Sequence, residues 1–153
     1  MRLWARTMSD YSSAFTRIRD AVAALPVDSA VIDGEAVLMR RDNTFDFEGL
    51  RSRQGQAEAI LVAYDIMEAE QDMRPEPLEE RRKRLAKLLS RKTKAMREGI
   101  QLSEAITGDG GLIFRHACGL GFEGIVSKRI GSRYVSGRTR AWLKTKNPEF
   151  ERP

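Results

Sequence analysis

Two lysines near the end of the chain have the spacing of an anion-binding strand. In the segment Trp142-Leu143-Lys144-Thr145-Lys146, a period of two places Lys144 and Lys146 on one face and Leu143 on the other. Two neighbouring ammonium groups repel each other, and their alignment suits an anion that lies between them, such as a triphosphate. Taken alone, the segment fits equally well an edge strand whose lysines prevent aggregation.

A second strand-like segment, residues 123–129, begins with an acid and ends with basic residues. The carboxylate of Glu123 could hold a divalent cation that neutralises phosphate charge, with Lys128 near the other end of the segment. Gly124 has no side chain and would leave room for a ligand to approach Glu123 closely. An amphipathic strand with charged ends is the alternative interpretation.

Two further patterns lie in the first half of the chain. Asp33-Gly34-Glu35 stands inside a stretch rich in β-branched residues, where Glu35 could accept a hydrogen bond from a ribose hydroxyl or serve a metal. Taken alone, an Asp-Gly pair is more typical of a tight hairpin turn. Tyr64 opens the segment Tyr64-Asp65-Ile66-Met67, which ends an apolar strand. Its ring could stack on a base, although a tyrosine in such a place is more often part of the core.

Hydrophobic periodicity and helix-breaking residues predict the elements that must position these patterns. Helices are predicted over 13–25, 47–53, 77–89 and 112–119, and strands over 3–6, 30–40, 60–67, 100–102, 123–127 and 142–146. Because helices and strands interleave without a regular βαβ rhythm, the predicted class is α+β. The helix over 77–89 has an apolar side of leucines, and its charged residues predict a solvated surface: Glu79, Glu80, Arg81, Arg82, Lys83, Arg84 and Lys87.

Composition indicates an ordinary globular domain with a basic surface. The chain has 153 residues, of which 41% are hydrophobic and 32% charged, and its net charge is +5. The excess of arginine suits phosphate oxygens, but the charge alone fits a solvated surface as well as a polyanion partner. The single cysteine excludes an internal disulfide, and no apolar run reaches the length of a membrane span or a signal-peptide core. A reducing, cytoplasmic location is the expectation.

The four patterns occur in the order of the later motifs of the ATP-dependent DNA ligases, and their joint occurrence is far more specific than any one of them. Connecting segments, such as Phe45-Asp46-Phe47 and Tyr134-Val135-Ser136-Gly137-Arg138, resemble the bacterial end-joining type of ligase. The resemblance runs from about Leu3 to Pro148. It implies the fold of an ATP-grasp-like nucleotidyltransferase, or adenylation, domain, in which antiparallel sheets are flanked by helices.

The resemblance also implies ligands and residue roles. ATP and Mg²⁺ would be the cofactors and nicked or broken duplex DNA the partner. At the nucleotide, Glu35 would contact the AMP ribose or metal, and Tyr64 would stack on adenine. The remaining roles are metal binding by Glu123, proximity to the phosphates for Lys128, stabilisation of the leaving pyrophosphate by Lys144 and Lys146, and DNA contacts by Arg6, Arg138 and Arg140. Met8 stands where the family usually has glycine, which puts the local turn in doubt.

One essential motif of the family does not occur in the chain. Family members form a lysyl-AMP intermediate on a Lys-x-Asp-Gly lysine. Here the first lysine is Lys83, and the two Asp-Gly pairs, at Asp33 and Asp109, are not preceded by lysine at that spacing. Residues 1–153 are therefore expected to be a partial adenylation domain, N-terminally truncated, without the oligonucleotide-binding barrel and inactive alone. A non-catalytic nucleotide- or DNA-binding remnant is the alternative. The connecting segments argue against an RNA ligase or a capping-type enzyme.

Overall fold

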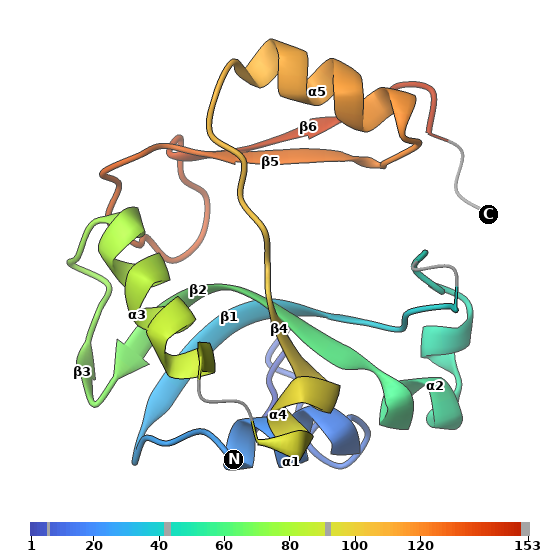
Figure 1. The fold of residues 1–153 in the computed structure, drawn as a ribbon, viewed down its shortest axis with the longest axis vertical. Helices are drawn as coiled ribbons and strands as arrows, with labels where there is room; N and C mark the ends of the chain where they lie inside the picture. The colour runs from blue at the N-terminus through green and yellow to red at the C-terminus, as the bar shows by residue number, and fades with distance from the viewer. Residues whose placement is uncertain (6, 42–43, 91–92, 151–153) are drawn as a thin grey trace.

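The computed structural model describes residues 1–5, 7–41, 44–90 and 93–150. A larger sheet with helices packed against it forms the base of the molecule, and a two-stranded sheet covered by one helix lies across from that base (Figure 1). This mixture of mainly antiparallel sheets and flanking helices confirms the predicted α+β class. No helix in the described ranges is both long and apolar enough to cross a membrane.

The base is built around the long central strand β2 (Ile60–Ala69). Strand β1 (Ala30–Val37) pairs antiparallel with β2 along its whole length and lies at an edge of the sheet. The short β3 (Gln71–Asp72) pairs antiparallel with the end of β2, and β4 (Ile100–Leu102) runs parallel to its beginning. Every other strand of the base thus takes its position from β2.

Three helices form the core against this sheet. Helix α1 (Thr16–Ala23) and helix α4 (Lys94–Gly99) pack on each other below the strands, and α3 (Leu78–Ser90) lies along β2 (Figure 1). One continuous cluster of buried apolar side chains joins them, and its most deeply buried large members are Ile18, Ile66, Leu85 and Met96. Burial of this cluster holds the base together because apolar area leaves water there.

The Asp33-Gly34 pair lies inside β1 rather than in a hairpin turn, so the interpretation favoured by the pair alone is wrong. Gly34 pairs with Ala63, and a Cβ atom built on it would lie 2.7 Å from the carbonyl oxygen of Val62. Glycine is therefore required by the close approach of β1 and β2, not by a turn. The β-branched residues on both sides of the pair continue the strand through it.

The N-terminal part and the region around residue 50 differ from the prediction. Instead of a strand over 3–6, the structure has a single bridge between Trp4 and Asp10, and Arg6 lies outside the described residues. The turn that was in doubt does form, with Met8 at φ 64°, a conformation that usually favours glycine. In place of one helix over 47–53 there are the 3-10 helix η1 (Gly49–Arg51) and the helix α2 (Arg53–Glu58).

The second sheet consists of β5 (Gly124–Lys128) and β6 (Trp142–Lys146), which pair antiparallel from Gly124 with Lys146 to Lys128 with Trp142. Helix α5 (Gly110–Gly119) packs on β5, and the Asp109 side chain caps it by accepting from the Leu112 N–H at 2.7 Å. We call α5, β5 and β6 the β5–β6 unit. The segment 103–109 leads from the base into this unit, and the loop 129–141 between its strands returns toward α3 (Figure 1).

Candidate functional site

A bulge in the base sheet collects polar side chains on one face. Asp33 pairs with Asp65 and Gly34 pairs with Ala63, so Tyr64 is an extra residue between two paired positions. Such a bulge re-aims side chains and is common beside active sites. It places Tyr64 and Asp65 on the face that Asp33 occupies, and Glu35, two residues after Asp33, belongs to the same face.

One face of the two-stranded sheet carries Lys128, Lys144 and Lys146, and this lysine-bearing face is directed toward Tyr64. Lys128 pairs with Trp142 and Val126 pairs with Lys144, so their side chains share one face of the two-stranded sheet. The Lys128 Nζ atom lies 4.5 Å from the centre of the Tyr64 ring and 3.7 Å from the centre of the Trp142 ring. The register of β6 confirms the predicted shared face of Lys144 and Lys146, and this is the face that looks toward the base.

The ammonium group of Lys128 is held between two aromatic rings. It is buried and has no hydrogen-bond partner in the part of the chain that the structure describes. Burial lowers the pKa of Lys128 to about 8, because the charged form loses hydration, although the carboxylates of Asp65 and Asp33 act in the opposite direction. Burial also raises the pKa of the Tyr64 hydroxyl, and the carboxylate of Asp33 adds to that shift.

We expect Lys128→Met to stabilise the protein at pH 7 and to lose this advantage as the pH rises. Because the pKa of Lys128 is lower in the folded chain, about 8 against 10.5, the unfolded chain binds more protons between these values. The stability of the parent therefore rises with pH across that window, and below it the full cost of burying the ammonium is present. Thermal unfolding should show the variant about 2–4 °C above the parent at pH 7 and much closer to it at pH 10.

The matched control for this prediction is Lys87→Met, because Lys87 is an exposed lysine of α3. Its difference from the parent should be small at both pH values. If Lys128→Met were less stable than the parent at pH 7, the two cation–π contacts would outweigh the desolvation of the ammonium, and the prediction would be wrong.

Gly124 allows the close approach of β5 and β6 and does not leave room for a ligand. It adopts φ 153°, and a Cβ atom there would overlap the carbonyl oxygen of Thr145 in β6. The room that the sequence suggested for a ligand is thus filled by β6, which corrects that interpretation. The unusual backbone also breaks the strand alternation and lets Glu123 reach Lys144, where its Oε1 atom lies 3.0 Å from Nζ.

The remaining predicted residues lie at the surface. Glu35 and Lys146 are exposed, and no direct bond between them occurs within the described ranges. Arg138 and Arg140 are exposed on the loop 129–141. The convergence of Glu35, Tyr64, Glu123, Lys144 and Lys146 on one cleft stays a prediction, whereas the contact of Tyr64 with the lysine-bearing face is observed.

A buried charged pair beside Tyr64 was missed by the sequence interpretation. Arg81 donates from Nε and Nη2 to the two carboxylate oxygens of Asp65, at 2.8 and 2.9 Å, and both side chains are 0% exposed. The prediction of a fully solvated charged surface on α3 is therefore wrong at Arg81. The signal was present, since Arg81 falls within the apolar stripe that Leu78 and Leu85 define at helical spacing.

A second polar contact joins β1 to the loop 129–141. The Tyr134 hydroxyl donates to Asp33 Oδ2 at 3.2 Å, and the Tyr134 ring packs edge-on against Trp142. Burial raises the pKa of Asp33 and raises that of Tyr134 to about 12, so the neutral phenol is a stable donor at neutral pH. Asp33, Tyr134 and Trp142 therefore belong to the candidate site, although only their neighbours were predicted.

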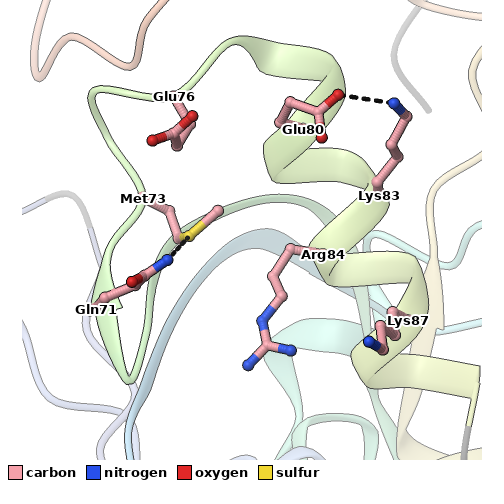
Figure 2. A pocket seen from close by; sticks show the side chains of 7 residues that line it. All are labelled: Gln71, Met73, Glu76, Glu80, Lys83, Arg84 and Lys87. Atoms are coloured by element: carbon pink, nitrogen blue, oxygen red, sulfur yellow. Dashed lines mark hydrogen bonds and ion pairs between the residues drawn. The ribbon is translucent and has the colours of Figure 1, made fainter.

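A shallow groove between β3 and α3 contains none of the predicted site residues. Its lining side chains do not point to a common centre (Figure 2). Two pairs of them bond each other instead, since Lys83 Nζ donates to Glu80 at 2.7 Å and Gln71 Nε2 donates to the sulfur of Met73 at 3.8 Å. We therefore place the candidate site at the Tyr64 face and not in this groove, whose lining residues are Gln71, Met73, Glu76, Glu80, Lys83, Arg84 and Lys87.

The donor set does not form a protein cage for a metal. Across the described residues, no three His, Cys, Asp or Glu side chains are grouped as metal ligands. Single carboxylates such as Glu35 and Glu123 are what Mg²⁺ uses when nucleotide phosphates and water supply its other ligands. The residues present thus fit a magnesium ion that arrives with a nucleotide.

Comparisons of the sequence with a family model and with curated relatives point to the same family. Residues 1–146 match the family model described as ATP dependent DNA ligase domain. The chain is 33% identical over 150 residues to the multifunctional non-homologous end joining protein LigD of Pseudomonas aeruginosa and 31% identical over 159 residues to a probable DNA ligase of Sorangium cellulosum. In both cases 95% of the chain is matched, but only 18% and 29% of the relatives' own lengths.

Solved structures agree with this. The ligase domain of LigD from M. tuberculosis superimposes with a TM-score of 0.76 at 28% identity, covering 95% of this chain and 46% of that one. A mycobacterial DNA ligase D complexed with ATP and MES gives a TM-score of 0.77 at 28% identity and covers 47% of that chain. The expected nucleotidyltransferase fold is confirmed by these matches, and this chain spans less than half of each matched chain.

Proposed function

Because this chain belongs to the ATP-dependent DNA ligase family, we propose that it binds ATP or AMP between the Tyr64 face of the base sheet and the lysine-bearing face of β6. The observation that carries the proposal is the contact of Lys128 Nζ with the Tyr64 ring at 4.5 Å. It brings an aromatic platform and a row of cations face to face, which suits a molecule with a flat base and a polyphosphate.

Different residues of the site would bind different parts of the nucleotide. Tyr64 would stack on adenine, and Glu35 would contact the ribose or the metal. An adenine on that ring face has to displace the Lys128 ammonium, which would then be free to move toward the phosphates. Lys144 and Lys146 would stabilise the phosphate charge as pyrophosphate leaves.

The proposal includes Mg²⁺ because the candidate site offers carboxylate oxygens as ligands. Glu123 would hold Mg²⁺ together with the phosphates, and the ion would neutralise charge that builds up there. Since the Glu123 carboxylate now bonds Lys144, binding of the ion would exchange one cation partner for another.

The proposed parent activity is the sealing of nicked or broken duplex DNA in repair and recombination, through enzyme-AMP and DNA-AMP intermediates, in the bacterial cytoplasm. The exposed Arg138 and Arg140, with Arg6, would contact the DNA backbone without reading its sequence. A non-catalytic nucleotide- or DNA-binding role is the alternative, and the lack of a Lys-x-Asp-Gly sequence in these 153 residues favours it for the chain by itself.

We expect Lys144→Ala combined with Lys146→Ala to weaken ATP binding by about tenfold or more, because two charge-assisted contacts to phosphate are lost. Isothermal titration calorimetry with ATP and Mg²⁺ measures the effect. The control is Lys83→Ala with Lys87→Ala, which removes the same charge from the exposed face of α3. Equal affinities in the two double variants would remove the phosphate role from Lys144 and Lys146.

A further inference from the structure

Two neighbouring arginines at the start of α3 bond both the segment that leads from the base into the β5–β6 unit and the loop that joins β5 to β6. Arg82 donates from Nη1 to the carbonyl oxygen of Tyr64 at 2.9 Å and from Nη2 to that of Ser103 at 2.7 Å. Ser103 is the first residue after β4 and begins the segment that leads to α5. Arg81 donates from Nη1 to the carbonyl oxygen of Ser132, in the loop that joins β5 to β6, at 2.9 Å.

Further contacts hold the same loop on the beginning of α3. A carboxylate oxygen of Glu79 accepts from the Gly131 N–H at 2.8 Å, and the Tyr134 N–H donates to the carbonyl oxygen of Arg74 at 2.9 Å. The Arg81 guanidinium lies over the Tyr134 ring, 5.7 Å from its centre. The loop is therefore attached at consecutive points to α3 and to the residues that precede it.

The chemistry of arginine suits this arrangement. A guanidinium presents five donors in a rigid plane, whereas the ammonium of lysine is a compact charge on a flexible stem. Arg81 uses two donors on Asp65 and directs Nη1 at the carbonyl oxygens of Glu76 and Ser132. With Asp65 buried and fixed, the direction of the remaining donors is fixed as well, so the Ser132 carbonyl has one preferred place.

We propose that Arg81 and Arg82 are positioning residues that set where the β5–β6 unit lies above the base sheet and so align Lys128 with Tyr64. Arg82 bonds the carbonyl oxygen of Tyr64 itself, and Arg81 bonds the carboxylate of the next residue. The two arginines thus connect the aromatic platform directly with the segments that carry the lysines. The consequence for nucleotide binding rests on the proposed function, but the effect on the geometry of the unit does not.

The test measures the position of the β5–β6 unit in the full 153-residue chain. In a Cys118→Ser background, His116→Cys on α5 and Gln54→Cys on α2 provide two exposed sites for spin labels. Pulsed electron paramagnetic resonance should give one narrow distance distribution for the parent and a clearly broader or shifted one for Arg82→Met. Arg82→Lys should lie between them, because an ammonium reaches one of the two carbonyl oxygens but not both.

The matched control is Arg84→Met, since Arg84 lies on the same helix and pairs with Glu70 instead of a connecting segment. It should keep the parent distribution. If Arg82→Met does not fold, the comparison of Arg82→Lys with Arg84→Lys carries the test. A parent-like distribution in the Arg82 variants, even with lowered thermal stability, would show a merely structural role and overturn the proposal.

Nucleotide affinity separates this proposal from the proposed function. If the aligned arrangement falls to about a tenth of the population in Arg82→Met, the apparent Kd for ATP rises about tenfold, while that of Arg84→Met stays unchanged. If the parent binds no ATP and the distance distribution of Arg82→Met is still broadened, the proposed function is wrong and the positioning role stands. A broadened distribution with unchanged, measurable affinity would overturn the link between position and binding.

Discussion

Incubation of the 153-residue chain with α-labelled ATP and Mg²⁺ should yield no labelled protein band after denaturing electrophoresis. Adenylation needs an amine in line with the α-phosphate, and no lysine here stands in a Lys-x-Asp-Gly sequence. The lysines of the candidate site have other partners, since Lys144 bonds Glu123 and Lys128 lies between two rings. We therefore expect no ATP-dependent nick sealing either, a loss of several orders of magnitude relative to a ligase that has its nucleophile.

Sealing of a pre-adenylated nick is the informative companion assay. That step needs no lysine nucleophile and depends on phosphate charge stabilisation, so slow sealing should survive at most. It should fall further in Lys144→Ala with Lys146→Ala but not in Lys83→Ala with Lys87→Ala. An acid-labile labelled band, as a phosphoramidate gives, would show that some lysine does serve as the nucleophile, and the prediction of inactivity would be wrong.

Replacement of Arg81 by methionine should destabilise the fold by about 3–5 kcal/mol in urea unfolding, the usual cost of leaving a buried charge without its partner. Asp65 is 0% exposed, and its two oxygens accept from Arg81 at 2.8 and 2.9 Å. The double variant Asp65→Asn, Arg81→Met should recover much of that loss, because no buried charge then remains.

An exposed pair of similar geometry provides the control. Arg74 also donates twice to one carboxylate, that of Asp72, but the two side chains are 54% and 49% exposed. Arg74→Met should cost no more than about 1 kcal/mol, because water screens the pair and solvates the remaining carboxylate. Equal losses in Arg81→Met and Arg74→Met would show that burial does not govern the Asp65–Arg81 contact.

Long and strongly patterned elements could be predicted from the sequence. The strands at 60–67, 100–102 and 142–146 and the helix at 77–89 all occur, with ends that agree within about two residues. The helix α4 and the two-residue β3 were not predicted, because fewer than two helical turns or two paired residues carry too little periodicity. The strand expected over 3–6 is a single bridge, since a local turn at Met8 competes with it.

The candidate site could be predicted where short motifs supply its residues. Tyr64, Lys128 and Lys144 were named from such motifs, and the structure places Tyr64 and Lys128 in contact. Asp65 and Arg81 were not assigned to the site. Arg81 was predicted to be solvated, because a charged residue on a helix more often is, and only the fold shows that the Asp65 carboxylate faces it. Pairing across 16 residues is a tertiary property that local patterns do not encode.

The sequence distances of the contacts around Arg81 have a consequence for the order of folding. Asp65 and Arg81 are 16 residues apart, whereas Arg81 and Ser132 are 51 apart, and Asp33 and Tyr134 are 101 apart. Closing a longer loop costs more chain entropy, so the nearer contact has the smaller barrier. A chain emerging from the ribosome could therefore complete β2 and α3 and neutralise the Asp65 carboxylate before residue 132 exists. The Arg81 guanidinium would then already be oriented by Asp65 when the carbonyl oxygen of Ser132 docks as the last partner.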